Sequence, residues 1–197
     1  MTRILLTGFE PFGGEDSNPS WAAVSLLADD PGVTVVRLDC VFDSSAKQLL
    51  AAVERTDPHL VVCVGQAGGI AGIEVERVAV NLDDAGIPDN AGRQPVDQPI
   101  EPCGPAAYFS SLPVKECVAA VQAAGLPASV SNSAGTFVCN HVAYTLAHLI
   151  ATERPALRGG FVHVPYSPNQ VLTGSHPSMA VTDAAEGLRA VIAAALA

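Results

Sequence analysis

Short apolar runs that alternate with helical patterns constrain the fold of this chain more than any other feature. The run Leu60–Gly65 is apolar throughout, which is typical of a strand whose two faces are both covered. The other predicted strands are Arg3–Thr7, Val33–Val41, Ile73–Asn81, Ala128–Val130 and Phe161–Val164. Helical patterns lie between or after them at 20–28, 44–55, 113–124, 138–151 and 179–197. This alternation predicts a mostly parallel sheet covered by helices on both faces.

Capping residues and proline-rich segments set the boundaries of these elements. Asn18 is a predicted N-cap with Pro19 at the first helical position, and Asp43 is a predicted cap for the second helix. The segment Leu82–Ala107 is rich in proline and has no periodicity. Because long structureless loops are uncommon, this one is predicted to be a functional loop or a subunit contact. Ser167–Ser178 is a further predicted loop.

Length and charge narrow the class of protein. A chain of 197 residues, 49% of them hydrophobic, predicts one domain over residues 1–197 with a sizeable core. Its net charge of −10 makes nucleic acid an unsuitable partner, because no cluster of Lys and Arg is present to neutralise phosphates. An anionic membrane surface is disfavoured for the same reason, and no apolar run is long enough to span a bilayer.

The cysteines and glycines argue against bound metals and nucleotides. The five cysteines are odd in number, widely spaced and form no C-x-x-C motif, which fits a reducing cytoplasm better than disulfides or zinc. The loop Gly8–Gly14 lacks the GK[ST] ending of a phosphate loop, and Gly65–Gly72 does not fit G-x-G-x-x-G. We therefore expect no cofactor.

The stretch Ser131–His141, SNSAGTFVCNH, is the first candidate for catalysis. It is predicted to run from a strand through a tight turn into a helix, with Cys139 in the first helical turn. The free N–H groups and the dipole at a helix start stabilise a thiolate and lower the thiol pKa, and they also bind a developing oxyanion. Cys139 is thus a candidate nucleophile. The alternative is a small buried cysteine with a packing role.

A cysteine nucleophile needs a base and a group that orients the base. Among the histidines, His163 lies near the carboxyl end of a predicted strand, and His176, in a loop, is the second candidate; His141 and His148 are interpreted as ordinary helix residues. Two acids in the strand-like run IEVERVAVN are candidates for the orienting group. Glu74 and Glu76 point to the same face, so spacing does not choose between them.

Three aromatic residues lie near the same predicted edge. Phe9 and Phe12 follow the first strand, and Phe137 precedes Cys139 by two residues. They are candidates for the walls of a small apolar substrate pocket, the alternative being packing beneath a loop.

Seven blocks in one order resemble pyroglutamyl peptidase I, a family of cysteine peptidases. They are TGFEPFGG with Asn18-Pro19, GQAGG, IEVERVAVN, DDAGIPDN, GPAAYFSSLP, SNSAGTFVCNH and GGFVHVPYSP, and they span nearly the whole chain. The resemblance implies an α/β/α sandwich that removes an N-terminal pyroglutamyl residue from peptides. It also implies a triad of Cys139 as nucleophile, His163 as base and Glu76, rather than Glu74, as acid.

The resemblance extends to the pocket and the assembly. It implies that Phe9, Phe12, Ile87, Phe137 and Val138 line a pocket for the lactam ring, that no metal is needed, and that the protein is a cytosolic homo-oligomer, a tetramer or dimer. Two positions depart from the family pattern: Gly86 stands where the family usually has arginine, and Cys103, which is given no role, stands where an acid is common.

Overall fold

A six-stranded sheet forms the centre of the protein. The computed structural model describes residues 2–197. The strands lie in the order β2-β1-β3-β8-β4-β7. Their bounds are β1 Ile4–Phe9, β2 Val33–Leu38, β3 Leu60–Gln66, β4 Ile73–Glu76, β7 Ala128–Ser131 and β8 Arg158–Val164.

The sheet is mostly parallel, as predicted, and its one antiparallel pairing matters for the site. β1 pairs in parallel with β2 and β3, β3 with β8, and β4 with β7, whereas β4 and β8 run antiparallel. The strands β4 and β7 therefore run opposite to the other four. The carboxyl-terminal half of β8 is therefore paired with the middle of β4.

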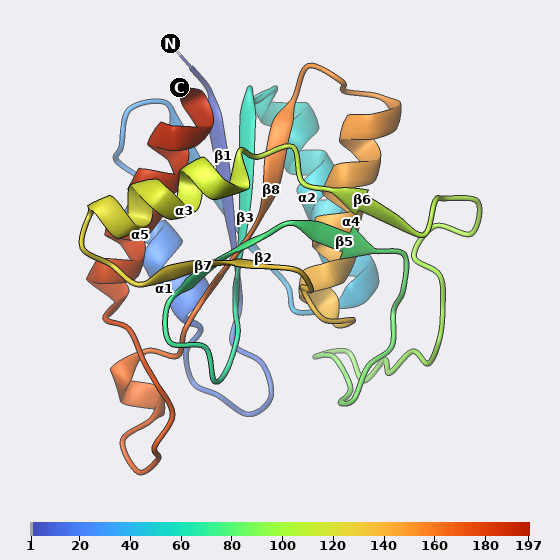
Figure 1. Cartoon of the computed structure of the whole chain (residues 1–197). Helices are drawn as coiled ribbons and strands as arrows, with labels where there is room; N and C mark the ends of the chain where they lie inside the picture. The colour runs from blue at the N-terminus through green and yellow to red at the C-terminus, as the bar shows by residue number, and fades with distance from the viewer. Residues whose placement is uncertain (1) are drawn as a thin grey trace.

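Helices cover both faces of this sheet (Figure 1). The helices α1 Pro19–Ser25, α3 Val114–Ala123 and α5 Val181–Leu196 pack on one face around the apolar cluster that contains Leu6, Val62 and Leu188. The helices α2 Phe42–Thr56 and α4 Val138–Thr152 pack on the other face around Leu5, Cys63 and Leu146. The alternate side chains of β1 and β3 enter the two clusters in turn, and the expected three-layer α/β/α sandwich is confirmed.

The predicted strand Ile73–Asn81 is wrong as a single element. β4 ends at Glu76, and β5 Val78–Val80 pairs instead with β6 Ala107–Phe109 in a separate antiparallel sheet. Arg77 divides the two: its N–H donates to Ser131 on β7, and its carbonyl accepts from Ser110 beside β6. No glycine or proline marks this point, but the apolar residues shift from odd positions in β4 to even positions in β5, so Glu76 and Arg77 are adjacent polar residues at the break.

The two predicted helix caps have different outcomes. Asn18 caps α1 as expected, since its side chain accepts from the Ser20 N–H at 3.0 Å. Asp43 is not a cap, because α2 begins one residue earlier at Phe42 with Val41 as N-cap. Asp43 lies in the first turn and pairs with Arg93 at 2.6 Å. Within residues 2–197, no helix is both long and apolar enough to cross a bilayer.

Candidate active site

The turn before α4 brings Cys139 over the central sheet. Gly135 has a φ of 76°, a left-handed conformation that glycine adopts readily, and it lets the chain turn from β7 into the helix. Cys139 is the second residue of α4, so the expectation of a first-turn position is confirmed. A Cβ built on Gly65 of β3 would lie 2.7 Å from the Cys139 Sγ. The thiol therefore sits directly against the backbone near the end of β3.

His163 and Glu76 form a buried pair beside this thiol. The Nδ1 of His163 lies 2.7 Å from Oε1 of Glu76, and the residues are only 5% and 2% exposed. His163 is paired in register with Gly65, the residue beneath the thiol. The structure thus gathers side chains from α4, β8 and β4 at one place, although they are far apart in sequence.

The Glu76 contact fixes which nitrogen of the imidazole is available. A carboxylate only accepts hydrogen bonds, so a neutral His163 donates from Nδ1 to Glu76 and keeps Nε2 as an acceptor. The second oxygen of Glu76, Oε2, is buried and has no hydrogen-bond partner in the part of the chain that the structure describes. Glu76 is therefore committed to a single interaction, with His163.

Electrostatics at Cys139 run against the expectation from the helix start. Burial raises the pKa of the Cys139 thiol, and the nearby Cys40, Glu76 and Cys63 raise the pKa further. The prediction of a lowered thiol pKa is therefore wrong for this structure, because desolvation disfavours the thiolate. A thiol with a raised pKa keeps its proton near neutral pH unless a base takes it.

The structure separates the alternatives that spacing left open. Glu74 lies opposite His163 in the strand register, but its Oε1 accepts from the Ser129 hydroxyl at 3.5 Å. The carboxylate in contact with the imidazole belongs to Glu76. His176 packs instead near the Tyr166 ring, with centroids 6.0 Å apart, on the loop after β8.

The five predicted pocket residues fall into three groups. The rings of Phe12 and Phe137 lie 6.0 Å apart, and both are partly accessible. Phe9 and Val138 are 2% and 1% exposed, so each supports a wall more than it offers a surface. Ile87 lies on the long loop after β5 and is 47% exposed.

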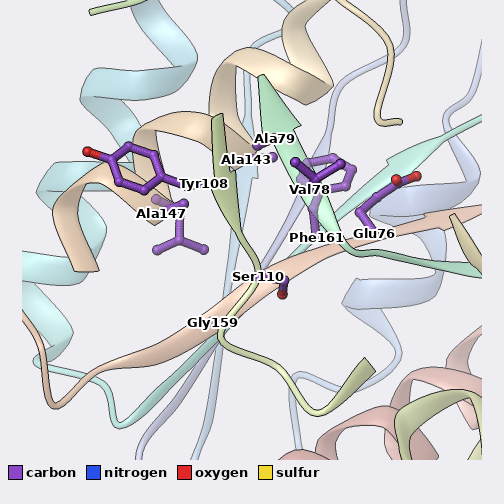
Figure 2. A pocket seen from close by; sticks show the side chains of 11 residues that line it. Glu76, Val78, Ala79, Tyr108, Ser110, Ala143, Ala147, Gly159 and Phe161 are labelled. Carbon is purple, nitrogen blue, oxygen red and sulfur yellow. The ribbon is translucent and has the colours of Figure 1, made fainter. Parts of the chain in front are cut away.

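A small cavity lies behind the Glu76–His163 pair. It has a volume of about 20 Å³, and Figure 2 shows Ala79, Ala143 and Phe161 around it with Glu76 at its edge. This space is close to that of a single water molecule, so it is too small for a peptide end. Residues 2–197 contain no group of three or more His, Cys, Asp or Glu side chains placed to hold a metal.

Sequence reasoning missed two polar residues next to the nucleophile. Asn140 is fully buried, and His141, interpreted as an ordinary helix residue, lies 2.9 Å from the buried carboxylate of Asp83. The signal was present in the sequence, because Asn and His interrupt an otherwise apolar helix and Asp83 follows an apolar strand. Buried polar groups of this kind need partners, and a position on an apolar face is the sign of one.

Known proteins are similar to this chain over nearly its full length. A sequence model of the family described as "Pyroglutamyl peptidase" matches residues 2–197. The "Pyrrolidone-carboxylate peptidase" of Streptomyces coelicolor is 61% identical, covering 99% of this chain and 92% of the relative. The protein of the same name from Bacillus licheniformis is 50% identical, covering 98% of this chain and 92% of the relative.

Solved structures have the same fold. The crystal structure of Bacillus amyloliquefaciens pyroglutamyl peptidase I superposes with a TM-score of 0.96 at 45% identity, covering 99% of this chain and 97% of that one. The pyrrolidone carboxyl peptidase from Thermococcus litoralis superposes with a TM-score of 0.94 at 35% identity, covering 100% and 94%. Agreement in sequence, in fold and over the full length leads to one conclusion: this chain belongs to the pyroglutamyl peptidase family.

Proposed function

We propose that this protein is a cysteine peptidase that hydrolyses the bond after an N-terminal pyroglutamyl residue of a peptide. The observation that carries the proposal is the buried Glu76–His163 pair beside the Cys139 thiol, in a chain whose relatives are named pyrrolidone-carboxylate peptidases. In this proposal Cys139 is the nucleophile, His163 the base and Glu76 the residue that orients the base.

The first chemical step is attack on the pyroglutamyl carbonyl. Because burial raises the thiol pKa, the proton of Cys139 moves to Nε2 of His163 as the sulfur attacks. The buried Glu76 carboxylate stabilises the imidazolium that results. The developing oxyanion is held by free N–H groups at the start of α4, a contribution of roughly 3 kcal/mol per donor in comparable sites.

Departure of the peptide amine completes acylation, and hydrolysis of the thioester follows. The imidazolium of His163 gives its proton to the leaving peptide amine, and the C–N bond breaks to leave a thioester on Cys139. A water molecule then loses a proton to His163 and attacks the thioester carbonyl. The C–S bond then breaks to release free pyroglutamate, and the imidazolium of His163 returns its proton to the Cys139 sulfur.

The chemistry of the pyroglutamyl residue accounts for the apolar side chains of the proposed pocket. A pyroglutamyl group is a small, uncharged lactam without a free amine, so a charged subsite that recognises an amine has no group to bind in it. The partly accessible rings of Phe12 and Phe137, supported by the buried Phe9 and Val138, supply an apolar slot. Ile87, on the exposed loop, is proposed as the remaining wall.

The proposal also covers the surroundings of the enzyme. Residues 1–197 act as one peptidase domain, since both helical layers pack on the same sheet. Five free thiols favour the reducing cytoplasm as its location. Assembly into a homo-oligomer is favoured by large apolar side chains left exposed, such as Phe109 at 77% and Leu172 at 80%.

The test is release of a fluorescent amine from its pyroglutamyl amide. Under reducing conditions we expect turnover by the wild type and a loss of at least about 1,000-fold in Cys139→Ser, because the alcohol is a far weaker nucleophile at this position. A Cys103→Ser variant is the matched control, since Cys103 is the exposed cysteine. A folded, reduced wild type without turnover contradicts the proposal.

A further inference from the structure

Residues 80–84, which run from the last residue of β5 into the loop after it, contact the start of α4 on both sides of Cys139. The helix-start residues involved are Thr136, Asn140 and His141, so every described polar side chain from 136 to 141 other than the thiol itself bonds to this segment. The contacts therefore surround the nucleophile in sequence without touching it.

Asn140 makes the most extensive of these contacts. Its Oδ1 accepts from the Val80 N–H at 2.9 Å, and its Nδ2 donates to the carbonyls of Val80 at 2.9 Å and Leu82 at 3.0 Å. Its exposure is 0%. The amide thus uses both its donor and its acceptor side on the backbone of one short segment, which defines its position closely.

Asp83 and His141 form a second buried carboxylate–imidazole pair. The Nδ1 of His141 lies 2.9 and 3.0 Å from the two oxygens of Asp83, and the residues are 7% and 2% exposed. The His141 ring packs edge-on to Phe42, whose ring packs edge-on to Phe137. The pair therefore supports both the helix start and one wall of the proposed pocket.

Backbone contacts complete the connection to the acid. The Asp84 N–H donates to the Thr136 carbonyl at 3.0 Å, and the Thr136 hydroxyl donates to the Asp84 carbonyl at 2.7 Å. The same chain runs back through β5 to Glu76, four residues before Val80. Residues 80–84 thus join the strand that carries Glu76 to the helix that carries Cys139.

We propose that Asn140 and the Asp83–His141 pair are positioning residues that set the place of the Cys139 thiol relative to Glu76 and His163. This inference rests on the proposed function. Burying a carboxylate, an imidazole and an amide costs free energy that an apolar contact would not, so these groups are best explained by the geometry that they fix. A misplacement of about 1 Å at a nucleophile lowers the rate by up to about 100-fold.

The test compares Asp83→Ala with Asp83→Asn. The alanine removes both acceptor oxygens, whereas the asparagine keeps one for His141. We expect kcat of Asp83→Ala to fall about 10- to 100-fold with KM changed less than about threefold, and Asp83→Asn to recover at least half of that loss on a logarithmic scale. If Asp83→Ala does not fold, Asn140→Ser replaces it, because serine is too short to reach Val80 and Leu82.

Tyr108→Phe is the matched control. Its hydroxyl lies 3.0 Å from Nδ1 of His148, so the substitution removes the partner oxygen of another histidine of α4, about two turns beyond His141. We expect this variant to lose stability but keep kcat within twofold. Equal kcat in Asp83→Ala, Asn140→Ser and Tyr108→Phe, with only melting temperatures lowered, overturns the inference.

A second readout separates this inference from the proposed function. The rate of Cys139 alkylation by iodoacetamide reports thiol placement and activation without any pyroglutamyl substrate. We expect that rate to fall at least about fivefold in Asp83→Ala and to stay unchanged in Tyr108→Phe. A wild type that alkylates selectively at Cys139 but cleaves no substrate contradicts the proposed function alone; an unchanged alkylation rate in Asp83→Ala contradicts the positioning role alone.

Discussion

Cys139 combines a raised thiol pKa with a neighbouring base, and this combination determines how its reactivity depends on pH. Burial disfavours the thiolate, so little free thiolate is present near pH 7. A buried cysteine without a base would be inert at that pH. In the proposed mechanism, reactivity near neutrality depends on transfer of the proton to His163, whose Nδ1 lies 2.7 Å from Glu76.

This dependence predicts a specific pH effect in His163→Ala. At pH 7 we expect alkylation of Cys139 by iodoacetamide to be slower than in the wild type by more than about 10-fold, because the thiol keeps its proton. As the pH rises, the thiolate forms without help and the difference between the two proteins shrinks. The measurement is the alkylation rate of Cys139 from pH 6 to 10, followed by mass spectrometry.

The exposed Cys103 is the internal control in this experiment, because its labelling reports the ordinary thiol in the same sample. Its rate is expected to be the same in both proteins at every pH. Equal rates at Cys139 in the wild type and His163→Ala at pH 7 would show that His163 does not activate the thiol.

Gly86 is a residue at which the family resemblance predicts an arginine, and its surroundings make the difference testable. A Cβ built on Gly86 meets no atom within 4 Å, and its backbone is outside the left-handed region. We therefore expect Gly86→Arg to change the free energy of unfolding by less than about 0.5 kcal/mol, the usual range for an open surface site. Urea unfolding measures this, and kcat/KM of the folded variant then reports the effect of the arginine on catalysis alone.

Among the secondary-structure elements, β3 and α4 meet at Gly65, where the glycine leaves room for the Cys139 thiol. A Cβ on Gly65 would lie 2.7 Å from the Cys139 Sγ and 2.8 Å from the Phe161 ring. Contacts below 3.0 Å force atoms to move, and here the thiol is one of them. The strand thus provides the floor of the proposed active site.

Gly65→Ala is accordingly expected to lower kcat by more than about 10-fold in a protein that still folds, since a displaced thiol attacks poorly. The control is Gly159→Ala on β8, where a Cβ would lie 2.9 Å from the Val61 carbonyl and far from the thiol. That variant should lose stability and retain kcat. Steady-state kinetics and thermal unfolding of both variants make the comparison, and equal kcat losses would contradict a specific role for the floor.

The strands and helices also show which structural features can be predicted from the sequence. Apolar runs such as Leu60–Gly65 identify strands, and the Asn18-Pro19 pair identifies a helix start, because each depends on local chemistry. The break at Arg77 has a local sign, because the apolar residues shift from odd to even positions there, but the distant strands that pair with β4 and β5 have none. Local pattern therefore predicts that an element exists better than it predicts its partners.

Some features of the proposed active site also follow from the local sequence, and others do not. The helix-start position of Cys139 follows from its local sequence, whereas the contact of Glu76 with His163 follows neither from spacing nor from strand register, which places Glu74 opposite His163. The resemblance to a family supplied what spacing left open, and the contact with His163 agrees with it. The Asp83–His141 pair joins residues that are 58 positions apart, so no local signal gave the pairing itself.

At the scale of the whole molecule, thiols in both cores give the protein a predictable response to alkali. Burial raises the pKa of Cys40 and of Cys63 from 9.0 to about 12, and that of Cys117 to about 11. Above pH 9 these thiols stay protonated in the folded protein but ionise in the unfolded chain. The stability that they contribute is complete below pH 9 and is lost as the pH rises toward 11 to 12.

We therefore expect the free energy of unfolding to decline above pH 9, with a slope that is shallower in Cys63→Ala. Each such thiol adds about 1.4 kcal/mol per pH unit to the slope within its window. Urea unfolding from pH 8 to 10.5 in the presence of reductant measures it. Because other groups also titrate there, the difference in slope between wild type and variant is the decisive quantity, and identical slopes would contradict the assignment to Cys63.

The antiparallel pairing of β4 with β8 also bears on how the enzyme acquires activity as it folds. Glu76 and His163 are 87 residues apart in the sequence, so their contact forms only when β4 and β8 have been brought together. Pairings of this range form late and slowly, whereas helices form early. During refolding, catalytic activity is therefore expected to return after helical structure. Activity in a newly made chain then indicates that β4 and β8 have paired.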